Sequence, residues 1–171
     1  METLKFYKTH PETYSPIFAT KQSACFDICF SSAGKSEYKG FSGQNAPITR
    51  YFRDTRGFVI MPGDRMMVPT GLILDIPEGY SVRVHARSGL SLKQGLVLVN
   101  AEGIIDSDYV EELFVLMTNI SDNPISINNG DRIAQGELVK VEQYVLEETS
   151  DKPATKTDRN GGMGSTGVKS T

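Results

Sequence analysis

Short runs of apolar residues, each bounded by turn residues, dominate the pattern along this chain of 171 residues. The runs are rich in β-branched and aromatic residues, and Pro-Gly, Pro-Glu-Gly, Asp-Asn-Pro and Asn-Asn-Gly signals separate them, as is typical of short β-strands. The expected strands fall within residues 58–61, 65–77, 80–86, 95–100, 112–120, 124–127 and 137–148. This spacing favours an all-β sandwich, jelly roll or barrel over a parallel sheet with crossover helices.

Helical signals are weak by comparison. Residues 88–94 and 132–137 could each form a single turn, and no longer segment shows convincing helical periodicity. We therefore expect at most one or two helical turns between the strands.

Two segments depart from the strand pattern. Residues 31–57 are polar and contain several glycines, which predicts a polar insertion, either a mobile surface loop or a hairpin, that could bind a partner. Residues 149–171 have almost no apolar content, so we expect a flexible arm after a β domain of residues 1–148. The arm contains the sequence GGMGSTG, whose backbone N–H groups could wrap a phosphate, although a simple flexible linker has the same composition.

The composition excludes several classes of protein. A chain of this length is expected to form one domain with a real core. The net charge of -3 and the pI of about 5.4 argue against a nucleic-acid-binding protein. No stretch approaches the roughly 20 apolar residues that cross a bilayer, and the amino terminus lacks the apolar centre of a signal peptide. We expect a soluble, cytoplasmic protein.

The two cysteines, Cys25 and Cys29, are predicted to be buried free thiols. On a strand they would share one face but lie too far apart to form a disulfide. The two histidines, His10 and His85, are distant from both cysteines in the sequence, so we do not expect a zinc site.

The segment from Arg87 to Tyr109 carries the strongest functional signal. It opens with a charged, hydroxylated turn, passes through an apolar run and reaches a second turn that holds Asn100 and Gly103; Asp106 follows closely. Polar groups at both ends of a tight hairpin can form a narrow pocket for a small polar ligand. An ordinary surface hairpin with scattered polar residues would show the same pattern, so both interpretations stay open at this point.

Five separated segments, in order, resemble the five motifs of the trimeric dUTPases (deoxyuridine triphosphate nucleotidohydrolases). They are ACFDI (24–28), ARSGLSLKQG (86–95), NAEGIIDSDY (100–109), GDRIAQGEL (130–138) and RNGGMGSTG (159–167). The connecting stretch PGDRMMVPTGLILDIPEGY (62–80) is also similar to the family. Five motifs in the right order are far more specific than any one of them.

The resemblance implies an all-β, distorted jelly-roll or barrel fold with a flexible C-terminal arm. It also implies a homotrimer whose active sites lie at subunit interfaces. The implied reaction is Mg²⁺-dependent hydrolysis of dUTP to dUMP and pyrophosphate, by attack of water at the α-phosphorus. This reaction limits uracil incorporation into DNA and supplies dUMP for dTMP synthesis. The location would be the cytoplasm, or the host cytosol if the protein is viral.

The resemblance assigns the general base to Asp106, which would deprotonate the attacking water. Asn100, Gly103 and Ile105 fall in the hairpin that recognises uracil, largely through its main chain. Tyr109 matches the residue that stacks under deoxyribose and leaves no room for a 2′-hydroxyl. Without the motif around them, Asp106 would be interpreted as a turn-stabilising aspartate and Tyr109 as a core aromatic residue. Their functional roles therefore depend on the motif.

The triphosphate would be held by the second and fourth motifs. Arg87, Ser88 and Gly89 match the phosphate-binding second motif, and Gln135 matches a phosphate contact in the fourth. Arg87 could instead serve mainly as an ion-pair partner across the trimer. Asp27 is expected near Mg²⁺ through water, with no direct protein ligand. We interpret Asp108, Asp131 and Arg132 as structural.

The last motif departs from the family pattern. Met163 stands where an aromatic residue usually caps the uracil ring, and Arg159 precedes the glycine pair by one residue where two are usual. Ser165 and Gly167 keep their expected places, and the resemblance also assigns Gly164 and Ser165 to the substrate-binding residues. A thioether covers an aromatic ring less completely than a phenyl ring does, so the resemblance implies looser closure of the arm over the substrate.

Two other functions compete with this interpretation. A dCTP deaminase shares the fold and part of the second motif, but it needs a catalytic glutamate near the position of Leu116. A dUTP-binding regulatory protein would present a nucleotide-dependent surface to a partner, with residues 31–57 as the candidate contact. An intact Asp106 argues against a purely binding role.

Overall fold

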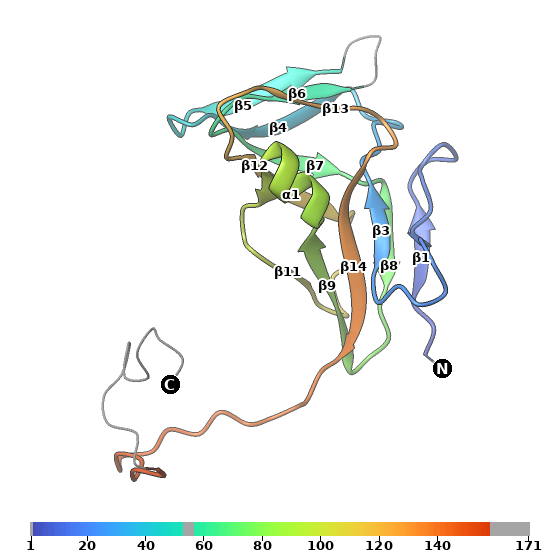
Figure 1. Ribbon diagram of the computed structural model, residues 1–171. Helices are drawn as coiled ribbons and strands as arrows, with labels where there is room; N and C mark the ends of the chain where they lie inside the picture. The colour runs from blue at the N-terminus through green and yellow to red at the C-terminus, as the bar shows by residue number, and fades with distance from the viewer. Residues whose placement is uncertain (1, 53–56, 158–171) are drawn as a thin grey trace.

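The computed structural model describes residues 2–52 and 57–157, and it is an all-β protein built around two five-stranded sheets (Figure 1). The first sheet has the order β10-β12-β7-β4-β5. Its strands span Leu96–Leu98 (β10), Phe114–Asn119 (β12), Arg65–Pro69 (β7), Glu37–Phe41 (β4) and Pro47–Tyr51 (β5). All four pairings in this sheet are antiparallel. The predicted all-β class is therefore confirmed.

The second sheet has the order β11-β9-β14-β3-β2 and is also antiparallel. Its strands span Gly103–Ile105 (β11), Tyr80–Ala86 (β9), Arg132–Lys140 (β14), Phe26–Cys29 (β3) and Ile17–Phe18 (β2). Two smaller antiparallel pairs complete the fold. They join Lys5–Lys8 (β1) to Leu72–Asp75 (β8), and Ile125–Ile127 (β13) to Phe58–Ile60 (β6).

The two large sheets share one hydrophobic core. Val82 and Val84 of β9 belong to the same buried cluster as Val115 and Met117 of β12. These residues alternate with more exposed neighbours along each strand, as expected for sheets that pack face to face. The alternation that predicts each strand therefore also determines which of its faces is buried.

Helical structure is confined to α1, Ser88–Gln94, within the described residues. The predicted turn at residues 88–94 is confirmed, and the helix ends at Gly95, which adopts a left-handed conformation with φ of 73°. The second predicted turn, at 132–137, is wrong because those residues belong to β14, between β9 and β3. Within residues 2–52 and 57–157, no helix has the length and apolar character that crossing a bilayer requires.

Two predicted strands have different limits. The run at 65–77 is two strands, β7 and β8, because Gly71 adopts a left-handed φ of 70° between them. The run at 137–148 stops pairing at Lys140. Beyond it, residues 141–157 leave the body as an extended segment without regular structure (Figure 1). Regular strand structure therefore ends at Lys140 within the described residues.

Of the two forms expected for residues 31–57, an insertion loop or a hairpin, the structure shows a hairpin over most of the described part of that segment. Strands β4 and β5 form a hairpin, and β4 also pairs with β7, so the hairpin extends a main sheet. Tyr38 is buried, with its ring centroid 4.5 Å from that of Phe58 and 5.1 Å from that of Phe52. This polar segment is thus a hairpin that shares the hydrophobic core.

The thiols are only half-buried. Cys25 and Cys29 are both free, as predicted, but neither is fully enclosed. Burial raises the pKa of the Cys29 thiol, with a further contribution from the Asp27 carboxylate. Burial and the Glu137 carboxylate raise the pKa of the Cys25 thiol. Both thiols therefore lose their protons less readily than an unperturbed cysteine does.

The buried aromatic contact makes a prediction about the hairpin. We expect Tyr38→Ala to lower the free energy of unfolding by about 3–5 kcal/mol, because it empties a buried aromatic site. The control is Tyr51→Ala on β5 of the same hairpin, whose side chain is 70% exposed and whose loss should cost within about 0.5 kcal/mol. Urea unfolding of both variants measures the difference. Equal, small effects would mean that the hairpin does not contribute to the core.

Candidate functional site

The candidate site forms where the chain passes from one main sheet to the other. Strand β10 pairs with β12 in the first sheet, and β11 pairs with β9 in the second. The expected tight hairpin of two paired strands is therefore wrong, because β10 and β11 lie in different sheets. Residues 99–102 make the connection, with Ala101 at a φ of 58° and the Glu102 N–H donating to the Asn100 carbonyl at 2.6 Å.

A cavity of about 340 Å³ lies beside this connection. Its lining combines apolar core residues with a small number of polar groups, as is usual for small-molecule sites. The predicted residues Asn100, Gly103, Ile105, Asp106 and Tyr109 all line it. The structure therefore brings together the residue expected to be the general base, Asp106, and the four residues expected to contact the base and the sugar.

Gly103 allows the connection to lie close to β9. A Cβ atom at this position would be 3.1 Å from the Cβ of Val84, its pairing partner, and 3.8 Å from Asn100 Nδ2. A contact of 3.1 Å is tighter than ordinary packing, so a side chain would push the two strands apart. The width of the cavity thus depends on a glycine at this position.

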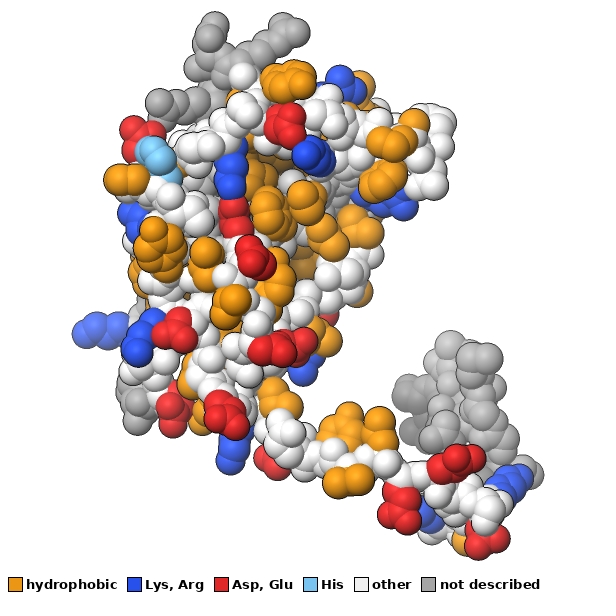
Figure 2. All heavy atoms as spheres, turned by 180° about the vertical axis from the view of Figure 1, so that it is seen from behind, with side chains coloured by type: hydrophobic (Ala, Val, Ile, Leu, Met, Phe, Trp, Pro, Cys, Tyr) orange, Lys and Arg blue, Asp and Glu red, His pale blue; other side chains and the backbone are white. Residues whose placement is uncertain are grey.

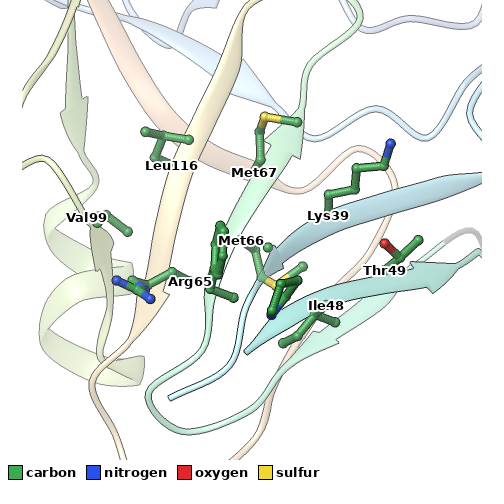
Figure 3. Close-up of a pocket in the computed structure, with 11 residues that line it drawn as sticks. Lys39, Ile48, Thr49, Arg65, Met66, Met67, Val99 and Leu116 are labelled. Carbon is green, nitrogen blue, oxygen red and sulfur yellow. The ribbon is translucent and has the colours of Figure 1, made fainter. Parts of the chain in front are cut away.

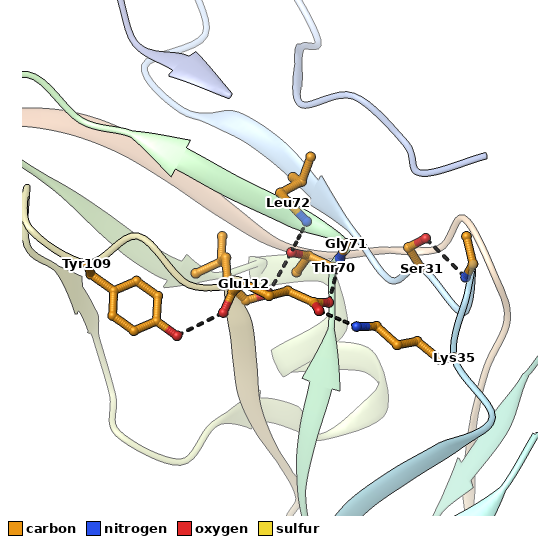
Figure 4. A network of polar contacts seen from close by, with 9 residues as sticks. Ser31, Lys35, Thr70, Gly71, Leu72, Tyr109 and Glu112 are labelled. Carbon is orange, nitrogen blue, oxygen red and sulfur yellow. Dashed lines mark hydrogen bonds and ion pairs between the residues drawn. The ribbon is translucent and has the colours of Figure 1, made fainter. Parts of the chain in front are cut away.

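The ring of Tyr109 is fixed by a polar network (Figure 4). Its hydroxyl donates to the backbone carbonyl of Glu112 at 2.8 Å. The Glu112 side chain accepts from the Gly71 N–H at 2.9 Å and is paired with Lys35. Glu112 and Lys35, which the sequence analysis did not identify, therefore anchor the segment that positions Tyr109.

The two carboxylates assigned to the site have opposite environments. Asp27 on β3 is buried, and its two oxygens contact Arg87 Nε at 3.3 Å and an Arg132 guanidinium nitrogen at 3.0 Å. Asp106 is exposed at the cavity, and no salt bridge joins it to any residue of the described part of the chain. Asp106 is therefore available to hold a water molecule, whereas Asp27 is already neutralised.

Arg87 acts as a structural cation within its own chain. Besides its ion pair with Asp27, it donates from the guanidinium group to the Arg132 carbonyl at 2.7 Å. Gln135 on β14 donates to the Ala86 carbonyl at 3.0 Å, next to Arg87. Asp27, Arg87, Arg132 and Gln135 thus form one polar cluster, called the cationic cluster below, on the adjacent strands β3 and β14 and at the residue that precedes α1.

Ser88 and Gly89 begin α1 and are both exposed. A Cβ atom added at Gly89 would meet nothing within 4 Å, so packing inside the chain does not require glycine there. Glycine in a helix costs about 1 kcal/mol relative to alanine. Glycine at this position therefore leaves the backbone open to close approach by a ligand or another chain.

The cationic cluster and the cavity are two separate parts of the chain. Arg87, Ser88, Gly89 and Gln135 are not among the residues that line the cavity. Asp131, which we interpret as structural, accepts a hydrogen bond from the Asn128 N–H at 2.7 Å and so holds a turn. Arg159, Met163, Gly164 and Ser165 lie outside the described residues.

A larger apolar groove of about 500 Å³ lies over β4, β5 and β7 (Figure 3). Its lining includes Phe41 and Ile48 from the hairpin and Met67 from β7, and it contains no carboxylate. Hydrolytic chemistry needs a group that can move a proton, so the smaller cavity with Asp106 is the better candidate. Leu116 lines both hollows with an aliphatic side chain, at the position where a dCTP deaminase would need glutamate.

A Cys, His and Glu cluster was not predicted. Within the described residues, Cys25, His85 and Glu137 have ligand atoms that all lie within 4.8 Å of one another. His85 is distant from Cys25 in the sequence, but the two side chains come together because β9, β14 and β3 are neighbours in one sheet. Distance along the sequence is therefore no evidence against a metal site here. Alternation predicts which residues share a face within β9 or within β14. Whether His85 and Glu137 share a face depends on the register between the two strands, which is not visible in the sequence.

The comparisons with known proteins all identify one family. A family model described as dUTPase matches residues 53–167. The deoxyuridine 5′-triphosphate nucleotidohydrolase of Caulobacter vibrioides is 46% identical over 153 residues, which cover 90% of this chain and 85% of that protein. The corresponding protein of Brucella melitensis is 46% identical over 116 residues, covering 67% of this chain and 73% of that protein.

Solved structures show the same fold. The Staphylococcus bacteriophage 80alpha dUTPase with dUPNHPP has a TM-score of 0.75 and 23% identity, covering 98% of this chain and 100% of that one. A dUTPase from Streptococcus mutans has a TM-score of 0.63 and 22% identity, covering 82% and 98%. These likenesses agree with the expected jelly-roll architecture.

The contrast between the two carboxylates predicts different effects on stability. We expect Asp27→Asn to lower the free energy of unfolding by about 1.5–3 kcal/mol, because it leaves two arginines without their buried anion. The matched control, Asp106→Asn, should change it by no more than about 0.5 kcal/mol. Denaturant unfolding of both variants tests this, and a larger loss for Asp106→Asn would show that Asp106 is structural.

Proposed function

The chain belongs to the dUTPase family, and we propose that it hydrolyses dUTP to dUMP and pyrophosphate by attack of water at the α-phosphorus. One observation carries this proposal: Asp106, Asn100 and Tyr109 line a single cavity in a member of that family. Removal of dUTP would limit uracil incorporation into DNA, and the dUMP formed would supply dTMP synthesis.

Asp106 is proposed as the general base. Its carboxylate would accept a proton from the attacking water, so that the oxygen attacks phosphorus as the bond to the pyrophosphate leaving group breaks. The exposed position of Asp106 and the lack of an ion pair to it within the described residues support this role. Both carboxylate oxygens of Asp27, in contrast, already contact arginine side chains, which leaves them less accessible to a water molecule.

The cavity is proposed to select the base and the sugar. Uracil would contact the connection at Asn100, Gly103 and Ile105, where the close approach of Gly103 to Val84 limits the space for a 5-methyl group. Tyr109 would lie against deoxyribose and exclude a 2′-hydroxyl, with its ring held by Glu112. A rigid wall of this kind rejects an added group by steric overlap.

The triphosphate is proposed to bind at Ser88, Gly89, Gln135 and Arg87. The open space above Gly89 supports the close approach of a phosphate to the backbone. Arg87 and Arg132 supply positive charge next to this surface, although both contact Asp27. In this arrangement Arg87 contributes mainly by ordering the surface and only secondarily as a ligand.

The residues of the site fit a Mg²⁺ ion that is held by the substrate. Asp27 is engaged by two arginines, so it suits contact with a hydrated ion through water and not direct coordination. Mg²⁺ commonly retains waters and binds through substrate phosphates, and when bound it would neutralise charge on the triphosphate. The phage phi11 dUTPase, with a TM-score of 0.67, coordinates a structural Mg(II) ion.

A homotrimer with shared active sites explains why the two parts of the site are separate in one chain. We propose that the cavity of one subunit faces the cationic cluster of another. The extended segment supports association, because Tyr144, Val145 and Leu146 are 79%, 91% and 88% exposed. Apolar side chains are visible along this segment in Figure 2. Such exposure is unfavourable unless another surface covers it.

The segment after residue 148 is proposed to act as an arm that closes over the substrate. Arg159, Met163, Gly164 and Ser165 would then contact the phosphates and the uracil ring, a role that rests on the family resemblance. Because free nucleotides are the substrate, we place the enzyme in the cytoplasm, or in the host cytosol if the protein is viral. The deaminase alternative is not favoured, because Leu116 cannot transfer a proton.

The proposed base gives the most direct prediction on activity. We expect Asp106→Asn to lower kcat for dUTP by about 100- to 10,000-fold, because water loses its proton acceptor, while dUTP still binds. Pyrophosphate release and calorimetric titration with dUTP measure these effects. Asp108→Asn is the control, since Asp108 is a neighbouring exposed carboxylate and should leave kcat close to the wild-type value. Wild-type turnover by Asp106→Asn would refute the assignment.

The exposed apolar triplet makes a prediction about assembly. Light scattering should give a mass of three times 18.8 kDa. Replacing Tyr144, Val145 and Leu146 together by serine should weaken association by at least about tenfold, because buried apolar side chains would be lost. Serine at Glu147 and Glu148 is the control and should leave the mass unchanged. A monomeric wild-type protein would contradict the shared site.

A further inference from the structure

Cys25, His85 and Glu137 form a cluster outside the proposed substrate site, and we propose that they bind a zinc-type divalent cation. Their ligand atoms all lie within 4.8 Å of one another. Cys25 directly precedes β3, His85 is on β9, and Glu137 is on β14, so three adjacent strands each contribute one side chain. The cluster lies on the same sheet face as Asp27 and Gln135, which are two residues along from Cys25 and Glu137.

The chemistry of the three groups suits zinc. Zn²⁺ is commonly bound by cysteine sulfur, histidine nitrogen and carboxylate oxygen, about 2.0–2.3 Å from the metal. Two ligand atoms of a tetrahedral site at those bond lengths lie about 3.3–3.7 Å apart. His85 Nε2 and Glu137 Oε1 are already 3.1 Å apart, so small side-chain movements would form the site. Loss of the thiol proton to solvent would give a thiolate, and the thiolate and Glu137 would together balance the charge of the cation.

The surroundings of His85 support this assignment independently. The other ring nitrogen, Nδ1, is 3.6 Å from Glu102 Oε1. Glu102 is in turn 3.3 Å from an Arg83 guanidinium nitrogen. Metal-binding histidines almost always donate their second ring N–H to a carboxylate or a similar acceptor, which fixes the tautomer and the ring orientation. At 3.6 Å Glu102 is an ion-pair neighbour of His85, and a small side-chain shift would let it accept from the Nδ1–H group and so turn Nε2 toward the cation. The charge of Glu102 is offset by Arg83.

The side chains are accessible enough to load a cation and enclosed enough to hold it. Side-chain exposure is 30% for His85 and 38% for Glu137, and Cys25 is half-buried. Three protein ligands leave the fourth position of a tetrahedral ion for water. A bound cation would link β3, β9 and β14 at the sheet that carries the cationic cluster, so we assign it a stabilising role. A thiolate selects zinc over magnesium, which separates this site from the metal proposed for the substrate.

The test uses the full-length protein, stripped with a chelator and titrated with Co²⁺ or Zn²⁺ alone, without nucleotide. We expect one ion per chain, a thiolate-to-cobalt charge-transfer band in the near ultraviolet, and a higher Tm with zinc. Cys25→Ser should remove the band and weaken zinc binding by more than about 100-fold. Cys29→Ser is the matched control, because Cys29 is the other half-buried free thiol and should leave the band and the affinity unchanged.

Two further variants keep the proposal testable if Cys25→Ser folds poorly. Glu137→Gln should weaken zinc binding while leaving circular dichroism unchanged, and Glu102→Gln should weaken it by about 10- to 100-fold with the cobalt band retained. Excess Mg²⁺ should not displace the ion. Absence of stoichiometric binding, or binding that Cys25→Ser leaves unchanged, would overturn the site. Because no nucleotide is present, either result is independent of the proposed hydrolysis.

Discussion

The candidate site depends on one constraint: the chain must leave one five-stranded sheet and enter the other within residues 99–102. Hydrogen-bonded pairing holds β10 to β12 on one side and β11 to β9 on the other. The core beneath, including Val84, Leu98 and Val115, belongs to both sheets. The position of the connection is therefore set by the packing of the whole domain, and the polar groups of the cavity are held on rigid elements.

Much of this architecture can be predicted from the sequence, for identifiable reasons. The strands after residue 57 are apolar runs bounded by turn signals, so their existence is visible although their ends are not. The β4–β5 hairpin is hidden because polar and apolar residues are mixed on both of its faces, and Tyr38 is its one buried side chain. Strands β1 and β2 are short and partly or fully exposed, so no alternation marks them. Residues 132–137 form a strand because the neighbouring β3 and β9 supply pairing partners that local propensity does not reveal.

The candidate site shows the same division. The five cavity residues lie close together in the sequence, so a local motif is enough to predict that they meet. The pairing of Asp27 with Arg87 and Arg132, and the approach of Cys25 to His85 and Glu137, join residues far apart in the chain. Such contacts follow from strand order and register, which a single sequence does not determine. The sequence also does not reveal that the cavity and the cationic cluster are separate in one chain.

The central claim is that a working site combines the cavity of one subunit with the cationic cluster of another. The most direct test mixes two variants, Asp106→Asn in the cavity and Gln135→Ala in the cationic cluster, once each is shown to be inactive alone, under conditions that allow subunits to exchange. Random mixing in equal amounts should restore about a quarter of wild-type pyrophosphate release from dUTP, because some sites then combine two intact parts from different chains. If the mixture stays as inactive as the separate variants after exchange is verified, each site is built within one chain and the account is wrong.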